Sequence, residues 1–359
     1  MFFAAGAKLM DSLTDFPVRL KNARLMKGWS MDELCSHMNP PVTKMTISRF
    51  EKGELKPNIT HLNALADALD LPCGYFLRPL KFQMETVRFR KKERVSGKME
   101  KRIEQVASDL IERYIEVEEI CGARCEEKFR RYDVANFEDA KNAARSLRIE
   151  WNLKDGCIGN VIELLEKHGV IVIELDAIPD FDGLSAWINE TYPVIVLAKN
   201  DYPERKRLTS FHELGHLLLN TDTSAMTQKE IENICNSFAS EMLLPESTLR
   251  KNLDSGKKDY TFYDIRPIQK EFGISFDAIM HKLKECGIIS KKRYAGYRIH
   301  KNQKPSYKAF VEQSCWHEEH SDRLFRLIGA ALEKGLITIS KAASLLGKNI
   351  DFVAREFAF

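Results

Sequence analysis

The sequence predicts a multidomain, mainly α-helical protein that contains one small α+β domain. The chain has 359 residues, which is too long for a single ordinary core, so two or three domains are expected. Apolar residues recur at helical spacing through most of the chain. A β-branched run at Gly169–Leu175 and two short apolar segments after it predict strands in the middle of the sequence.

The composition is that of a soluble globular protein, with 44% hydrophobic and 30% charged residues. The net charge of +3 is small for this length, so any nucleic-acid site must be local. No segment has the pattern of a signal peptide or a membrane span, which predicts a cytoplasmic protein without a membrane partner. The eight cysteines are expected to be reduced thiols, because the sequence shows no secretion signal. Cys121 and Cys125 lack a second Cys pair or a nearby His pair, so a zinc site is not expected there.

Residues 16–79 are predicted to form five short helices. Ser30 and Glu33 form a capping box, in which each side chain satisfies an exposed backbone donor at the start of the second helix. After a proline turn, Thr43 is a natural cap for a third helix, Lys44–Glu51.

This segment resembles a helix-turn-helix domain of the Xre/Cro type, which we place at 15–79. Residues at fixed places in the family pattern carry the resemblance: Leu20, Arg24, Gly28, Ser30, Leu34, Val42, Thr46, Ile47, Ser48, Glu51, Lys52, Gly53 and Pro57. The turn before the third helix is longer than the commonest form because of Pro40 and Pro41, which bears on the docking angle more than on the fold.

A short third helix can enter the major groove of double-stranded DNA, which is the expected partner of this domain. The residues on its exposed side are the candidate DNA contacts: Lys44, Met45, Thr46, Ser48 and Arg49. Ile47 and Phe50 are expected in the core. The alternative is a small helical bundle used for dimerisation or protein recognition.

Residues 80–150 are predicted to be a charged helical connector. Its basic stretch at 88–94 could track a phosphate backbone by releasing counterions, but a solvated surface is the favoured interpretation. From Gly97 a long helix carries an apolar stripe, which predicts packing against a neighbouring element or, in a homodimer, a second copy. Two further helices are expected at Phe137–Trp151 and Gly156–His168.

A metal motif follows the strands, which we expect to form a small antiparallel sheet. Pro203 opens a helix at Glu204–Asn220. On this helix His212 and His216 are four residues apart, so both imidazoles project from one face and can reach the same metal. Strands before the motif and apolar residues around it favour a metal site over two ordinary surface histidines.

Two neutral imidazoles suit tetrahedral zinc, and a catalytic site needs a third protein ligand and an open position for water. Glu213 lies beside the histidines and can accept a proton from that water and pass it to the leaving amine. The sequence therefore predicts a zinc metalloendopeptidase of the His-Glu-x-x-His type with one ion per chain. Manganese or iron also fits such ligands.

The third ligand is expected on the next helix, Thr227–Leu244, where Glu230, Glu232 and Glu241 are candidates. Spacing alone does not choose among them. The histidine motif, the segment 232–239 and Leu243-Leu244-Pro245 together resemble the ImmA/IrrE metallopeptidase family. The resemblance implies that Glu232 completes the zinc site, that Asn236 and Glu241 are structural, and that the peptidase domain spans 151–250.

The resemblance also implies a function, because family members make limited cuts in a partner repressor during stress responses or mobile-element control. Helix-turn-helix domains fused ahead of such a peptidase are a familiar arrangement. The leading hypothesis is therefore a DNA-associated zinc endopeptidase that cleaves a regulatory protein. The alternatives are a transcription regulator, or an antitoxin-like binding protein, whose peptidase domain senses or binds a partner without turnover.

Residues 251–359 are expected to be mostly helical. Helices at Thr261–Phe272 and Ser275–Cys286 and a strand at Arg293–Ile299 resemble a winged-helix piece. The segment 339–347 resembles a further helix-turn-helix unit, although we favour a helical cap that frames the cleft. His317 and His320 are interpreted as surface residues rather than metal ligands.

Overall fold

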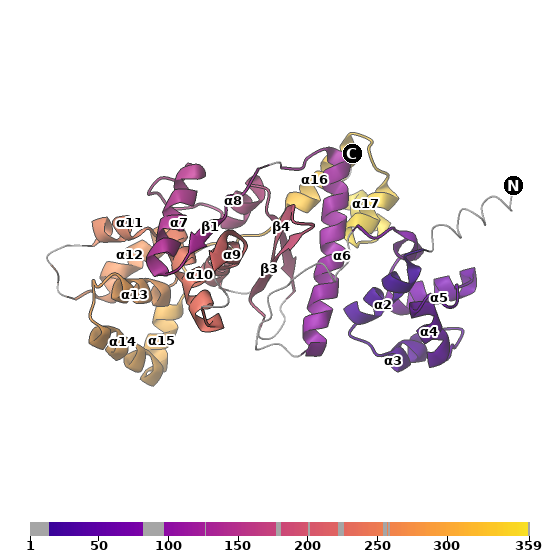
Figure 1. The fold of residues 1–359 in the computed structure, drawn as a ribbon, viewed down its shortest axis with the longest axis horizontal. Helices are drawn as coiled ribbons and strands as arrows, with labels where there is room; N and C mark the ends of the chain where they lie inside the picture. The colour runs from indigo at the N-terminus through magenta and orange to yellow at the C-terminus, as the bar shows by residue number, and fades with distance from the viewer. Residues whose placement is uncertain are drawn as a thin grey trace. The chain divides into compact units, whose positions relative to one another are not determined.

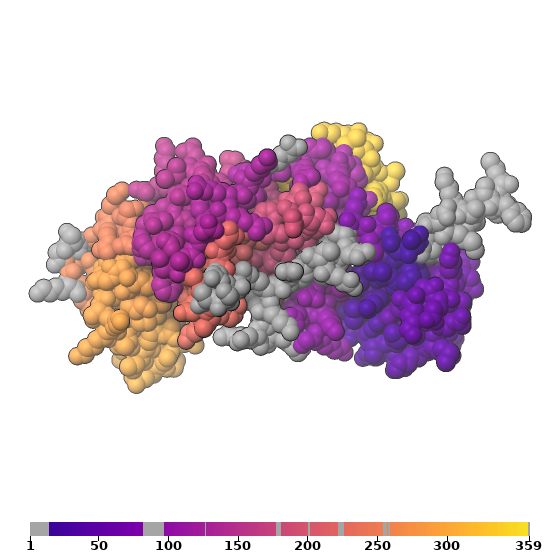
Figure 2. Space-filling model, viewed as in Figure 1, coloured from indigo at the N-terminus to yellow at the C-terminus, as the bar shows by residue number. Residues whose placement is uncertain are grey.

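The computed structural model describes residues 14–81, 97–125, 127–176, 181–199, 202–221, 226–253, 257 and 259–357. The basic stretch at 88–94 lies outside these residues. The chain divides into two compact units, one formed by residues up to 124 together with 322–359 and the other by 125–321. Figure 1 shows the helices and strands of each unit, and Figure 2 shows the surface that they form. In the described ranges no helix is long and apolar enough to cross a membrane.

The first unit begins with the expected helical bundle, in which the fifth segment is a 3-10 helix. Its elements are α2 (Phe16–Met26), α3 (Met31–His37), α4 (Lys44–Glu51), α5 (Ile59–Leu69) and η1 (Cys73–Leu77). Ser30 and Glu33 form the capping box of α3, and Thr43 caps α4, as predicted. Ile47 and Phe50 are fully buried, which confirms that this face of α4 packs into the core.

A buried ion pair fixes α4 against α2. Nε and Nη2 of Arg24 donate to the two oxygens of the Glu51 carboxylate, at 2.6 and 2.8 Å, and Nη1 donates to the carbonyl of Trp29. Bidentate pairing of this kind holds both the distance and the angle between two helices. It therefore sets the orientation of α4, the helix expected to enter DNA.

The first unit also contains α6 (Gly97–Cys121) and three C-terminal helices: α16 (Arg323–Glu333), α17 (Ile339–Leu346) and α18 (Ile350–Glu356). Val117 of α6 shares a hydrophobic core with Ile328, Leu345 and Val353. We expected the segment 339–347 to frame the cleft of the metal domain. In the structure this segment packs on the apolar stripe of α6, within the first unit.

The second unit is built on a three-stranded mixed sheet of order β2-β4-β3, with β2 (Ile171–Leu175), β3 (Gly183–Ile188) and β4 (Tyr192–Ala198). Strands β3 and β4 form the expected antiparallel hairpin, whose turn places Asn189 and Glu190 in the left-handed region. The prediction of an antiparallel sheet is wrong for β2, which pairs with β4 in parallel. A parallel central pair is normally buried, and β2 and β4 are buried along most of their length.

The same unit contains helices and a short parallel pair of strands, β1 (Tyr132–Val134) and β5 (Leu219–Thr221), which lies apart from the three-stranded sheet. The helices are α7 (Phe137–Glu150), α8 (Val161–Lys167), α9 (Pro203–Leu218), α10 (Gln228–Leu243), α11 (Glu246–Asn252), α12 (Phe262–Phe272), α13 (Phe276–Glu285), α14 (Lys291–Gln303) and α15 (Pro305–Glu312). One hydrophobic core extends from Tyr132 to Val311, so this unit is wider than the expected domain at 151–250.

The expected strand at Arg293–Ile299 is wrong, because these residues lie inside α14. The buried residues of α14, Tyr297 and Lys301, are one helical turn apart, and this spacing matches a helix rather than a strand. The segment is therefore a helical extension of the core and not the wing of a winged helix.

Candidate metal centre

Helix α9 is held between the sheet and α10 by apolar residues on either side of the histidine motif. Phe211, Leu214 and Leu218 are fully buried. Gly215 allows the close approach of α10, because a Cβ at this position would lie only 3.2 Å from the ring of Phe238. A side chain at this position would require the Phe238 ring to move by a few tenths of an ångström. This contact brings the face of α10 that carries Glu232 up to the two histidines.

Three potential ligand side chains converge at this point. Nε2 of His212 lies 3.1 Å from Nε2 of His216, and the two Glu232 carboxylate oxygens lie 3.1 and 3.4 Å from these two nitrogens. Ligands about 2.0–2.1 Å from a tetrahedral metal are separated by roughly 3.3 Å, so the three side chains are spaced as one ion requires. The neighbouring imidazoles of His212 and His216 hold the pKa of Glu232 far below its usual value, so this carboxyl group is an anion.

The outer nitrogens of both imidazoles also have partners on α10. Oδ1 of Asn236 accepts a hydrogen bond from Nδ1 of His212 at 2.9 Å, which leaves the Nε2 lone pair directed at the metal position. Sγ of the buried Cys235 lies 3.2 Å from Nδ1 of His216. Asn236 was expected to be structural, and in the structure its side chain holds the imidazole ring of His212. Cys235 was not recognised from the sequence, although it directly precedes Asn236.

Glu213 is almost completely buried, with an exposed fraction of 1%. Its Oε2 accepts a hydrogen bond of 2.9 Å from the hydroxyl of Ser185 on β3. Sequence reasoning did not single out Ser185. The available signal was a polar residue in an otherwise apolar strand, since a buried hydroxyl normally requires a partner.

Comparison with known families now identifies this region. Residues 165–284 match the family model described as the IrrE N-terminal-like domain of the peptidase class, and residues 20–76 match a helix-turn-helix model. The chain carries an IrrE-like domain. Together the two matches describe a DNA-binding regulator with a metallopeptidase-like domain, of a family that is typically metal-dependent.

One solved structure with detectable similarity is a Mycobacterium tuberculosis transcriptional regulator. It shares 18% sequence identity over 48% of this chain, with a TM-score of 0.30. The match spans about half of that protein, 51% of its chain. No curated protein matches the chain significantly.

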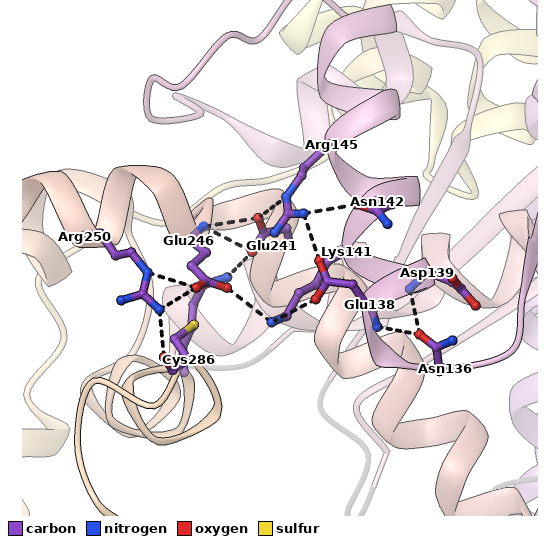
Figure 3. A network of polar contacts seen from close by, with 11 residues as sticks. Asn136, Glu138, Asp139, Lys141, Asn142, Arg145, Glu241, Glu246, Arg250 and Cys286 are labelled. Atoms are coloured by element: carbon purple, nitrogen blue, oxygen red, sulfur yellow. Dashed lines mark hydrogen bonds and ion pairs between the residues drawn. The ribbon is translucent and has the colours of Figure 1, made fainter.

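The two other candidate ligands of the IrrE-like domain are engaged elsewhere. Glu230 forms a capping box with Thr227 at the start of α10. Glu241 is fully buried and accepts hydrogen bonds from Lys282 at 2.6 Å and Arg145 at 3.0 Å, in the network shown in Figure 3. Of the three glutamates considered, Glu232 is therefore the one that the fold brings to the histidines.

His317 and His320, the other closely spaced histidines, do not form a comparable group. Among the described residues, His212, His216 and Glu232 are the one set of three compact enough to hold a metal ion. His320 pairs with Glu174 and Glu318. The neighbouring Glu319 is buried against Arg207 of α9 and the indole nitrogen of Trp316.

The outer-shell contact of Asn236 predicts a loss of metal affinity when it is removed. Without this acceptor the His212 ring can rotate and change tautomer, so Asn236→Ala should weaken zinc binding about 10- to 100-fold. Competition with a chromophoric chelator measures the change. The exposed Asn233→Ala, on the same helix, is the matched control. Equal affinities of the two variants would show that Asn236 does not orient the ligand.

The candidate DNA contacts on α4, the third helix of the N-terminal domain, differ in their exposure to solvent. Lys44, Met45 and Arg49 are exposed, whereas Thr46 and Ser48 are half-buried. Met45 is the most exposed of its apolar residues at 73%. Lys44 forms an exposed ion pair of 2.6 Å with Asp32, which is weak and can be exchanged for a phosphate contact.

Arg49→Ala should weaken binding to a duplex selected by the full-length protein from random sequences by about tenfold or more, because one base or phosphate contact is lost. Fluorescence anisotropy measures the affinity, and zinc content should be unchanged. Arg355→Ala, an exposed arginine of α18, is the control. Unchanged DNA binding by Arg49→Ala would favour the dimerisation interpretation of this domain.

Proposed function

We propose that the IrrE-like domain is a zinc-dependent endopeptidase that makes limited cuts in a partner regulatory protein, a transcriptional repressor, in stress-response or mobile-element control. The N-terminal domain brings this activity to an operator. The observation that carries the proposal is the convergence of His212, His216 and Glu232 within 3.1–3.4 Å of one another, beside the buried Glu213.

The chain's own residues divide into ligands and a base. His212, His216 and Glu232 would hold one Zn²⁺, which when bound supplies Lewis acidity to a water and to the scissile carbonyl. The Glu213 carboxylate accepts a proton and returns it to the leaving amine. The Ser185 hydroxyl holds Oε2 of Glu213 in place, so this side chain needs little reorganisation during the reaction.

The edge of the sheet suggests how a peptide would bind. In the described sheet β3 pairs with β4 on one side, and its other edge has no partner strand. An extended peptide can be recognised by adding to such an edge through main-chain hydrogen bonds. Because Ser185 on β3 contacts Glu213, a peptide added to β3 would run past the proposed base.

The test is incubation of the zinc-loaded protein with candidate repressors encoded beside its gene, followed by mass spectrometry of the products. We expect discrete fragments from the wild-type protein and none from Glu213→Gln. Release of an intact repressor by both proteins to the same extent would instead favour a regulator that binds its partner without turnover.

A further inference from the structure

The segment 286–311 contains a local concentration of positive charge. It holds seven lysines and arginines and no aspartate or glutamate, whereas the whole chain has a net charge of only +3. The rest of the chain is therefore net negative. The seven residues lie on or between α14 and α15: Lys291, Lys292, Arg293, Arg298, Lys301, Lys304 and Lys308.

Two of these cations have structural partners. Lys301 is buried and pairs with Asp277 and with Glu312, the latter at 2.8 Å. Arg293 pairs with Asp259 at 2.6 Å. Within the described residues, the side chains of the other five have neither an ion pair nor a hydrogen bond.

The five remaining cations are exposed, and we call them the basic surface: Lys291, Lys292, Arg298, Lys304 and Lys308. Three of them occupy an arc of about 120° on α14, opposite its buried Tyr297. Lys304 ends α14, and Lys308 follows on α15, which lies against α14 (Figure 1). With about 1.5 Å per residue, α14 spreads these charges over about 20 Å. Figure 2 shows this region as part of the orange surface at the lower left.

The placement of these charges is unfavourable for the fold itself. Lys291 and Lys292 open the first turn of α14, where the helix dipole disfavours cations, and no acidic residue occupies that turn. The general repulsion among like charges gathered on one surface adds to this cost. Such local conflicts in a folded domain often mark a surface that serves binding.

We propose that the basic surface binds the phosphate backbone of duplex DNA, as a second contact besides the helix-turn-helix domain. Charges spread over about 20 Å fit an extended polyanion better than a single small anion, and duplex DNA carries one charge per roughly 1.7 Å. The same chain has a DNA-binding domain, so a duplex is the polyanion it meets. The contact carries no sequence information and adds affinity by releasing counterions.

The test is the salt dependence of DNA binding by the full-length protein, measured by fluorescence anisotropy on a 30-base-pair random duplex. A triple variant, Lys291→Gln, Lys292→Gln and Arg298→Gln, should bind about 10- to 100-fold more weakly at moderate salt. The slope of log affinity against log salt should fall by about 2–3, since each lost phosphate contact removes about 0.9. The double variant Lys304→Gln, Lys308→Gln should lower the slope by about 1–2.

The matched control removes three exposed lysines elsewhere in the same unit: Lys128, Lys229 and Lys270. Its affinity and slope should stay close to those of the wild type. Equal slopes for the basic-surface triple variant and this control would overturn the proposal. It would also be overturned if the triple variant lost binding to phosphatidylglycerol vesicles and kept its DNA binding. Repeating the series in an Arg49→Ala background separates this contact from that of the N-terminal domain.

Discussion

Replacing Glu213 with glutamine should lower the rate of substrate cleavage by about 10²- to 10⁴-fold, which is the usual contribution of a general base. Glutamine has nearly the shape of glutamate and can still accept the Ser185 hydrogen bond through its amide oxygen. It cannot take up the proton at neutral pH. The rate should therefore fall without a change in the fold or in the three metal ligands.

The measurement is single-turnover cleavage of the repressor, with zinc content determined on the same samples. Glu230→Gln is the matched control, because Glu230 only caps α10 and lies outside the ligand group. Its cleavage rate should stay within a few-fold of the wild type. A Glu213→Gln protein that retains zinc and cleaves at the wild-type rate would exclude Glu213 as the base.

The metal helix was predictable because its information is local. Two histidines four residues apart must share a helix face, and the residues between them fix where Glu213 lies. Assignment of Glu232 needed the family resemblance. Spacing along α10 leaves three glutamates equivalent, and only the packing of α10 on α9 at Gly215 distinguishes them. Ser185 was missed for the same reason, since its partner lies 28 residues away.

The errors concern pairings between segments that are distant in sequence. The hairpin of β3 and β4 follows from a short polar turn, but the parallel pairing of β2 with β4 depends on how the chain crosses over. The segment 339–347 was expected to be a helical cap that frames the cleft. Its apolar face does not identify its neighbour, and in the structure this face packs against Val117 of α6. An amphipathic pattern predicts a helix and its buried face, not its neighbour.

Glu241→Leu should reduce the stability of the IrrE-like unit by about 3–5 kcal/mol, because it leaves the buried Lys282 ammonium without its counter-charge. Lys282 and Glu241 are both almost completely buried, and their charged atoms lie 2.6 Å apart. The backbone N–H of Glu246 also donates to the same carboxylate. Figure 3 shows how this side chain connects Arg145 of α7 with the start of α11.

The ion pair also predicts a pH dependence. Burial alone would raise the pKa of Glu241, but Lys282, the Glu246 backbone and Arg145 together lower it below its usual value. A carboxylate whose pKa is lower in the folded state stabilises the fold above its unfolded pKa, near 4.5, and loses this contribution as the pH falls. The wild-type unit should therefore lose stability in acid. The difference between wild type and Glu241→Leu should shrink there.

Urea unfolding followed by tryptophan fluorescence measures these effects, since Trp151, Trp187 and Trp316 lie in this unit and only Trp29 lies in the other. Glu138→Ala removes an exposed partner of the same Arg145 and should cost less than about 1 kcal/mol. The double variant Glu241→Leu, Lys282→Met removes both charges and should be more stable than Glu241→Leu alone. If the double variant were the less stable of the two, the cost would come from lost packing, and the buried ion pair would not be what couples α7, α10 and α13.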